Sequence, residues 1–299
     1  MQNQFDPFKL RTISIKSRNS LVRRGERVTI PPPDRALVIQ IEELATEIVR
    51  AYCQKAPVII GMGAHLIKLG LTGYLLDLML NRVIQCVGMN GAAAFHDMEL
   101  DVFGVTSESV EETLTAGTFG MAAESADLYN LAAVMASSRG RGWGSMMGEL
   151  ILERNPSAGG ILATCHKCCI PATIHSTIGA DVAHMHYSAS GEAIGRVSMR
   201  DFRTFVGMVL NLKNGVYVNI GSSCTMPEVF LKAVAIAFNQ GRDLSGLVTA
   251  NIDMLDHYRP RMNVLKRIPG KSIDIRGRHE MVLPALYVAV SRRLDLIPE

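Results

Sequence analysis

Short apolar runs alternate along the chain with longer segments in which apolar residues recur at helical spacing. The runs, which predict buried strands, span residues 57–60, 82–88, 160–163, 172–175, 216–220 and 247–252. The helical segments span residues 36–53, 64–80, 198–213 and 227–240, and further helices are expected to fill much of 107–154. Because the runs lack in–out alternation, both faces of their sheet should be covered. The pattern therefore predicts an α/β fold with a doubly wound, mainly parallel sheet and helices on both faces.

The beginning of the chain differs from the rest. Residues 1–35 are polar and basic and end in the stiff segment Ile30–Pro33. From residue 36 onward the alternation continues without a break in composition, and a chain of this length can bury one large core. We therefore expect an N-terminal arm over residues 1–35 and a single domain over residues 36–299.

Charge and cysteine content narrow the choice of partners. Lys and Arg number 31 against 28 Asp and Glu, and the resulting net charge of +3 does not suggest nucleic acid, which selects a clustered basic face. No apolar stretch reaches the roughly 18 to 20 residues of a membrane span, and the N-terminus lacks the apolar core of a signal peptide. Six scattered cysteines without an export signal should be reduced. We expect a cytoplasmic protein with a small-molecule partner, and neither nucleic acid nor a membrane.

Two glycine-containing turns follow predicted strands, which is where doubly wound sheets bind ligands. Gly61, Gly63 and Ala64 follow the first strand, and Asn90 and Gly91 follow the second. Glycines let the backbone approach a phosphate at the start of a helix, although the third glycine of the dinucleotide fingerprint is absent here. A tight turn without any ligand would need the same glycines. We assign these five residues to a cofactor site, with a purely structural turn as the alternative.

His96 and Asp97 follow the second turn, with Glu99 close by. A histidine beside carboxylates can transfer protons near neutral pH. His96 and Asp97 are therefore candidate catalytic residues. The ordinary acidic first turn of a helix would give the same pattern, and that interpretation stays open.

A third turn runs from Gly221 through Ser222 and Ser223 into a helix whose start is marked by Pro227. A strand, a Gly-Ser-Ser turn and the N-terminus of a helix can together hold a phosphate or a carboxylate. Simple capping of the helix is the alternative. We include Gly221, Ser222 and Ser223 in the predicted cofactor site.

Histidines and cysteines gather in the middle of the chain. Cys165 and Cys168 have zinc-like spacing, but a clean second pair is missing, so we expect no metal. Asp181 is followed closely by His184 and His186. These three residues are a better functional candidate, and both histidines are assigned to substrate binding.

A last polar group follows the predicted strand 247–252. Asn251 ends that strand, and His257, Arg259 and Arg261 come shortly after it. Arginine is well suited to bind a carboxylate or a phosphate in a bidentate manner. We assign Asn251 to the cofactor and the other three residues to the substrate.

The order of these motifs resembles the deoxyhypusine synthase family over roughly residues 36–290. The resemblance rests on the segments 61–70, 89–97, 170–186, 221–223 and 248–251. It implies a doubly wound fold that binds NAD, with Asp181 in contact with the cofactor. It also implies a homotetramer, and a catalytic lysine that would correspond to Lys266.

The departures from that family matter for function. Phe95 and His96 stand where the family has two glutamates, and Met226–Pro227 replaces a lysine–histidine pair. Fewer acidic residues, together with Arg259 and Arg261, point away from a polycationic substrate. We expect an NAD-dependent enzyme that acts on a C–N bond of an amine or amino-acid-like substrate, rather than true deoxyhypusine synthesis. The alternatives are an enzyme similar to ornithine cyclodeaminase, and a non-catalytic nucleotide- or ligand-binding protein of the same fold.

Overall fold

A six-stranded parallel sheet organises the computed structural model, which describes residues 4–26 and 32–296. In chain order its strands are β2 (Val58–Met62), β3 (Cys86–Asn90), β5 (Ala172–His175), β6 (Val216–Ile220), β7 (Val248–Asp253) and β8 (Lys271–Arg276). Across the sheet the order is β5-β3-β2-β6-β7-β8. The strand order therefore reverses between β2 and β6. In open α/β sheets, ligands bind outside the carboxyl ends of the strands at such a switch point.

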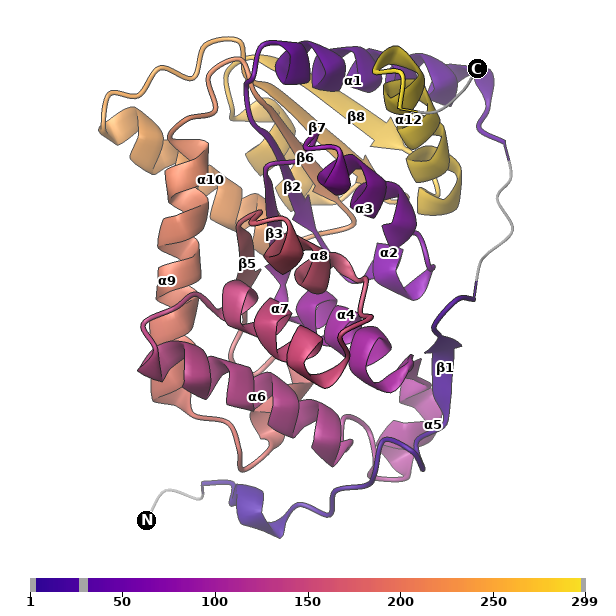
Figure 1. Cartoon of the computed structure of the whole chain (residues 1–299), viewed down its shortest axis with the longest axis vertical. Helices are drawn as coiled ribbons and strands as arrows, with labels where there is room; N and C mark the ends of the chain where they lie inside the picture. Colours follow the sequence, from indigo (N-terminus) through magenta and orange to yellow (C-terminus); the bar gives the residue numbers. More distant parts are fainter. Residues whose placement is uncertain (1–3, 27–31, 297–299) are drawn as a thin grey trace.

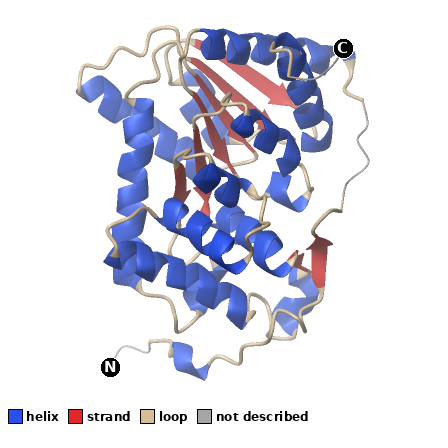
Figure 2. Cartoon of the chain, viewed as in Figure 1, coloured by secondary structure: helices blue, strands red, loops and turns tan. Residues whose placement is uncertain are grey.

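Helices cover both faces of this sheet (Figure 2). One face packs against α1 (Arg35–Cys53), α3 (Thr72–Leu80) and α12 (His279–Arg293), and the other against α9 (Gly191–Val209), α10 (Thr225–Asn239) and the π-helical turn η3 (Arg261–Lys266). Neighbouring residues of one strand enter different cores, because side chains alternate along a strand. Ile60 lies in the first core, and Ile59 lies in the second. The predicted doubly wound fold is confirmed.

The connection from β3 to β5 builds most of the lower half of the molecule (Figure 1). It contains α4 (Gly91–Phe103), β4 (Val105–Glu108), α5 (Val110–Thr115), α6 (Ala123–Ser138), α7 (Trp143–Arg154) and α8 (Ile161–Lys167). The shorter elements of the chain are η1 (Pro7–Lys9), β1 (Ser20–Arg23), α2 (His65–Lys68), η2 (Val182–Met185) and α11 (Tyr258–Pro260). Strand β1 pairs antiparallel with β4 at this lower end.

Most predicted strands are confirmed, and one is wrong. The runs 172–175 and 216–220 form β5 and β6 with the expected bounds. The run 160–163, in contrast, begins helix α8. Its backbone N–H groups are held by two buried carboxylates, because Asp97 accepts from Ile161 and Leu162 and Asp101 accepts from Gly160. The predicted helix 64–80 divides into α2 and α3, and strand β8 was not predicted.

The N-terminal segment lies against the rest of the chain. Besides the pairing of β1 with β4, Ile13 forms an isolated bridge with Ala122, and the Arg18 side chain is buried against Glu99. Ile30 and Pro31 of the predicted stiff segment Ile30–Pro33 lie outside the described residues. The division into an arm over 1–35 and one domain over 36–299 stays a prediction.

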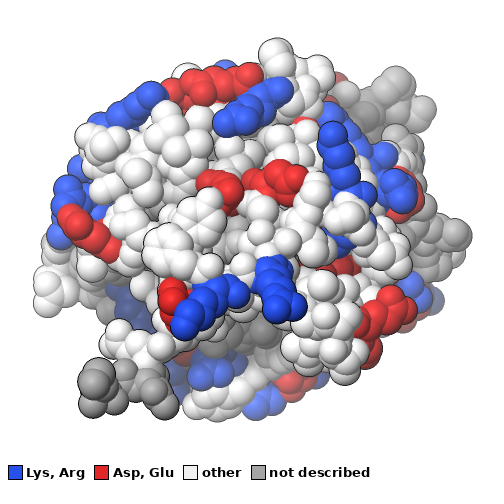
Figure 3. Space-filling model, turned by 90° about the horizontal axis from the view of Figure 1, so that it is seen from below, with Lys and Arg blue, Asp and Glu red and all other residues white. Residues whose placement is uncertain are grey.

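Within the described ranges, none of the helices combines the length and the apolar character that crossing a bilayer requires. Figure 3 views the molecule from below, and there basic and acidic side chains are interspersed with broad uncharged areas. The described part of this face therefore carries no continuous basic band.

Asp201 of α9 joins three elements of the fold. Its Oδ1 accepts from the Trp143 N–H at 3.0 Å, and its Oδ2 accepts from Gly144 at 3.0 Å and from Ile174 at 2.8 Å. The carboxylate thus caps the N-terminus of α7 and ties it to β5. Burial raises the pKa of Asp201 to about 7.

We expect Asp201→Ala to lower the free energy of unfolding by about 3 kcal/mol, because three buried N–H groups would lose their acceptor. Urea denaturation at pH ~8, above the pKa of the carboxyl group, would measure the loss. Asp243→Asn is the matched control, since Asp243 forms an exposed pair with Lys213 and its replacement should change stability far less. Equal effects of the two substitutions would contradict this role for Asp201.

Candidate functional site

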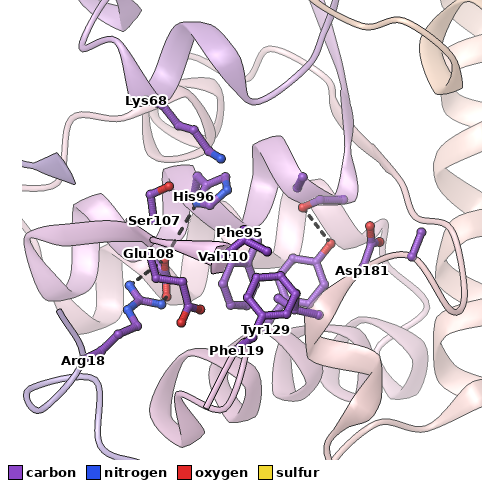
Figure 4. A pocket seen from close by; sticks show the side chains of 15 residues that line it. Arg18, Lys68, Phe95, His96, Ser107, Glu108, Val110, Phe119, Tyr129 and Asp181 are labelled. Carbon is purple, nitrogen blue, oxygen red and sulfur yellow. Dashed lines mark hydrogen bonds and ion pairs between the residues drawn. The ribbon is translucent and has the colours of Figure 1, made fainter. Parts of the chain in front are cut away.

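A cavity of about 170 Å³ lies beside the carboxyl end of β3, at the start of α4 (Figure 4). Helix α2, helix α6, strand β4 and the loop after β5 complete its wall. Its lining includes three carboxylates and three aromatic rings besides one arginine, one lysine and one histidine; Lys68, His96, Glu108, Asp181, Phe95 and Tyr129 are among these residues. The cavity thus combines an apolar floor with charges of both signs, as small-molecule sites commonly do.

Glu99, which also lines the cavity, is fully buried and accepts four hydrogen bonds. Arg18 forms a bidentate pair with it through bonds of 2.8 and 3.1 Å. The hydroxyl groups of Thr106 and Ser125 donate to it at 2.5 and 2.6 Å. Because a buried carboxylate is stable only when its charge is paired and its oxygens are bonded, these donors hold Glu99 in place. The result is a rigid wall built from the N-terminal segment, α4, β4 and α6.

The same network fixes the state of His96. Its Nδ1 lies 2.6 Å from the Thr106 hydroxyl, whose single proton is donated to Glu99. The hydroxyl can therefore only accept from His96, so the neutral imidazole carries its proton on Nδ1. Burial, with the charges of Lys68 and Arg18, lowers the pKa of His96 to about 3. At neutral pH, Nε2 is a free base with its lone pair available.

Negative charge lies at the far side of the cavity from Lys68 (Figure 4). The carboxylate of Asp181 lies over Gly91, where a Cβ atom would come within 1.9 Å of Oδ2. Only glycine fits at this first residue of α4. Burial raises the pKa of Asp181, although the Ser176 hydroxyl at 2.8 Å and the Thr177 N–H at 3.2 Å donate to it and oppose this shift. Glu108 adds a buried Oε2 that has no partner among the described residues.

A second group of predicted residues meets at the switch point between β2 and β6. Gly63 donates to the Ile220 carbonyl at 2.9 Å, and a Cβ on Gly63 would lie 2.2 Å from the Gly221 oxygen. The two turns therefore touch, and Ala64 follows as the first turn enters α2. After the second turn, Ser222 accepts from Met226 inside α10.

The residues around this contact leave hydrogen-bonding capacity unused. Cys224 provides no side-chain cap for α10, and Ser223 beside it is exposed. His279 of α12, with 1% of its surface exposed, lies against Gly221 and 5.4 Å from the ring of His65. Neither ring nitrogen of His279 has a hydrogen-bond partner in the described part of the chain. A buried polar group of this kind calls for a water molecule or a ligand.

Several predicted residues have structural roles. Asn90 caps α4 through the Ala93 N–H at 2.8 Å, and Gly61 packs inside the sheet against the Tyr217 ring. Asn251 is buried between Asn219, at 2.8 Å, and Asp274, at 3.4 Å, on neighbouring strands. These contacts account for the polar and small residues at strand ends without any ligand.

The predicted proton-transfer pair is not formed, because Asp97 caps α8 while His96 faces the cavity. Burial and the nearby Asp101 carboxylate raise the pKa of Asp97. His184 contacts the Ser176 hydroxyl at 3.2 Å near Asp181, whereas the His186 Nε2 lies 2.7 Å from the Gly120 carbonyl and holds that loop.

The predicted substrate arginines and the predicted catalytic lysine lie outside the cavity. Arg259 pairs with Glu228 and Arg261 with Asp256 on the surface beside η3, and His257 precedes α11 there. Lys266 is exposed at the end of η3, five residues before β8 begins at the amino edge of the sheet. The site edge is the opposite, carboxyl edge.

Sequence reasoning missed Arg18, Lys68, Glu108, Tyr129 and His279. Arg18 belongs to a segment read as an arm, and Lys68 ends the single helical turn of α2. Glu108 and Tyr129 fell in a region expected only to be helical. None of these residues belongs to a recognisable motif, and only the fold brings them to the strand ends.

No family model and no curated protein sequence matches the chain. Solved structures do: AgrE, in its ternary complex with ornithine and NAD⁺, gives a TM-score of 0.57 at 14% identity over 90% of this chain and 35% of AgrE. A protein from Methanococcus maripaludis S2 described as a conserved LOR/SDH protein gives 0.58 at 16% identity, over 90% of this chain and 71% of that protein. Identities this low show the fold alone. The chain spans about a third of the length of AgrE.

A protein from Entamoeba histolytica described as a deoxyhypusine synthase gives a TM-score of 0.49 at 10% identity, over 86% of this chain and 88% of that protein. A likeness at this level carries no argument about function. The Rossmann-like fold of the chain is shown, while membership in the deoxyhypusine synthase family stays a prediction.

The neutral state of His96 gives stability a defined pH dependence. Its pKa is about 3 in the folded protein and 6.5 in a free histidine, so between these values the unfolded chain binds a proton that the folded chain does not. The contribution of neutral His96 is complete above pH 6.5 and is lost as the pH falls. The difference in unfolding free energy between wild type and His96→Gln should therefore shrink on acidification, by up to about 1.4 kcal/mol per pH unit. Denaturant titrations of both proteins between pH ~7 and pH ~5 would measure it, and a constant difference would show that the pKa of His96 is the same in the folded and unfolded states.

Proposed function

We propose that this chain is an NAD-dependent enzyme that acts on a C–N bond of an amine or amino-acid-like substrate. One observation carries the proposal: a dinucleotide-type switch point and a charged cavity with a neutral histidine lie along the same carboxyl edge of the sheet. A cavity of about 170 Å³ suits a substrate of amino-acid size and is too small for a dinucleotide. The cofactor would therefore lie along the strand ends.

The residues at the switch point fit a dinucleotide diphosphate. Helix α10 has 15 residues, and its N-cap residue Cys224 makes no side-chain cap. Ser222 occupies the Met226 N–H, so the positive end of the helix and its remaining first-turn N–H groups can meet a phosphate. The contact between Gly63 and Gly221 brings the start of α2 beside it. The unpartnered nitrogens of buried His279 supply a further hydrogen-bond donor. We propose Gly63, Ala64 and residues 221–225 as the diphosphate site.

The cavity residues fit the reaction. A bound nicotinamide would accept a hydride from the carbon that bears the nitrogen. Nε2 of His96 would take the proton that this nitrogen loses, because the Thr106 bond fixes the ring with its lone pair free. Either Asp181 or the unpartnered Oε2 of Glu108 would hold an ammonium group of the substrate. Buried Glu99 and Arg18 neutralise each other and keep the wall fixed.

The structural neighbours support the choice of substrate class. AgrE binds ornithine and NAD⁺ in its crystal, and its fold resembles that of this chain. This favours an amino-acid-like substrate and keeps an enzyme similar to ornithine cyclodeaminase as the second candidate. The homotetramer implied by the family resemblance and the cytoplasmic location expected from the sequence stay predictions, as does a catalytic role for Lys266.

Cofactor binding can be tested with the cysteine at the start of α10. Cys224 is exposed beside the proposed diphosphate site, and Cys169 is exposed after α8. NAD at tenfold its dissociation constant should slow thiol labelling of Cys224 by about tenfold and leave Cys169 unchanged. Peptide mapping after brief alkylation measures both residues in one sample. Equal protection of both, or of neither with NAD bound by calorimetry, would place the cofactor elsewhere.

Turnover is tested by NADH absorbance with ornithine and other amino acids. His96→Gln should lower kcat/KM by about 100-fold, because the proton acceptor is lost, and should leave the affinity for NAD unchanged. His257→Gln is the matched control, since His257 lies outside the cavity. NAD binding without NADH formation from any amine would support the non-catalytic ligand-binding alternative.

A further inference from the structure

Lys68 is the one residue of α2 whose side chain enters the cavity. Figure 4 shows its amine pointing toward the ring of His96. Lys68 makes no hydrogen bond or ion pair with any residue that the structure describes, and it is half-buried. A lysine that serves only solubility or pairing is normally exposed or bonded to an acid. The position of Lys68 therefore suggests a chemical role.

The surroundings of Lys68 favour the uncharged amine. Removal from water lowers the pKa of Lys68, and the more distant charge of Glu99 only partly opposes this. Arg18 neutralises Glu99 by direct contact at 2.8 Å, which weakens that opposition further. His96 offers the free lone pair of Nε2 on the cavity side, because Nδ1 is occupied by Thr106. A half-buried, unbonded amine whose pKa is lowered, beside a neutral base, is the arrangement of an activated nucleophile.

We propose that Lys68 is a nucleophilic amine that forms an imine with the carbonyl carbon of a small aldehyde in this cavity, with His96 as the proton carrier. The proposal concerns this chain without any cofactor, so it does not depend on the proposed function. The aromatic wall of Phe95 and Tyr129 gives the carbon chain of the aldehyde an apolar surface.

The step balances without an oxidant or a reductant. The lone pair of Lys68 Nζ attacks the carbonyl carbon, and the C=O electron pair moves to oxygen. Nζ loses one proton to His96 Nε2, and His96 passes this proton to the oxygen to give a neutral carbinolamine. As the C–O bond breaks and the C=N bond forms, His96 carries the second Nζ proton to the departing oxygen, which leaves as water. One amine and one carbonyl thus give one imine and one water.

Other lysines of the chain serve as internal comparisons. Lys167 donates to the Ala158 carbonyl at 2.6 Å, so its amine is occupied. Lys266 is exposed and lies outside the cavity. Lys271 is held by Glu43 and Glu47, which raise its pKa. None of these three combines an unbonded amine with a neighbouring base.

The test is reductive trapping with propanal and cyanoborohydride at neutral pH, followed by site-resolved peptide mapping of the full chain. We expect Lys68 to be labelled several-fold faster than Lys266, Lys167 or Lys271. His96→Gln should slow labelling of Lys68 toward the rate of Lys266, with the circular dichroism spectrum unchanged. Lys68→Met should lose the fast-labelled peptide and leave the slow ones.

The relative labelling rates of the lysines in the wild-type protein test the proposal even where a variant fails to fold. Labelling of Lys68 at or below the rate of Lys266 would overturn it. A rate for Lys68 that is fast and unaffected in folded His96→Gln would also overturn it, since the proton carrier would then be unnecessary. Fast labelling that depends on His96 is the supporting outcome.

Discussion

The carboxylate of Glu99 is the centre on which the cavity depends. It lies on α4 and is reached by donors from the N-terminal segment, from β4 and from α6, so four parts of the chain are joined through one group. Without Arg18 the carboxylate would be a buried, uncompensated charge, which costs several kcal/mol. Through Thr106, the same carboxylate decides which nitrogen of His96 is free. The Glu99 carboxylate therefore both holds the cavity wall together and determines the tautomer of His96.

The sheet could be predicted from the sequence because burial on both faces demands continuous apolar runs. The runs 172–175 and 216–220 are of this kind, and they gave β5 and β6 with the correct bounds. The prediction failed where tertiary contacts override local pattern. Gly160–Ala163 looks like a strand, yet Asp97 and Asp101 cap it as a helix from a distance in sequence. Strand β8 (Lys271–Arg276) was not predicted, because it is an edge strand whose charged residues leave no continuous apolar run.

The residues of the candidate site could be predicted only in part from the sequence. The rule that ligands bind at carboxyl ends of strands directed attention to Gly91, His96 and Asp181, and all three line the cavity. The same rule could not tell a glycine that admits a ligand from one that admits another part of the protein. Gly63 admits the Gly221 turn, and Gly91 admits Asp181. Arg18 and Lys68 needed the fold itself, since nothing in their neighbours marks them as buried.

The pairing of Arg18 with Glu99 also has a kinetic meaning. The two residues are separated by 81 positions, and β1 and β4 are about as distant along the chain. Contacts between segments so far apart require the closure of a long loop, and the entropy of that closure favours the release of an end segment. The N-terminal segment is held by β1, by the bridge of Ile13 with Ala122 and by this ion pair, so it can detach while the parallel sheet stays folded. Because Arg18 lines the cavity, a ligand held there would slow the release of this segment.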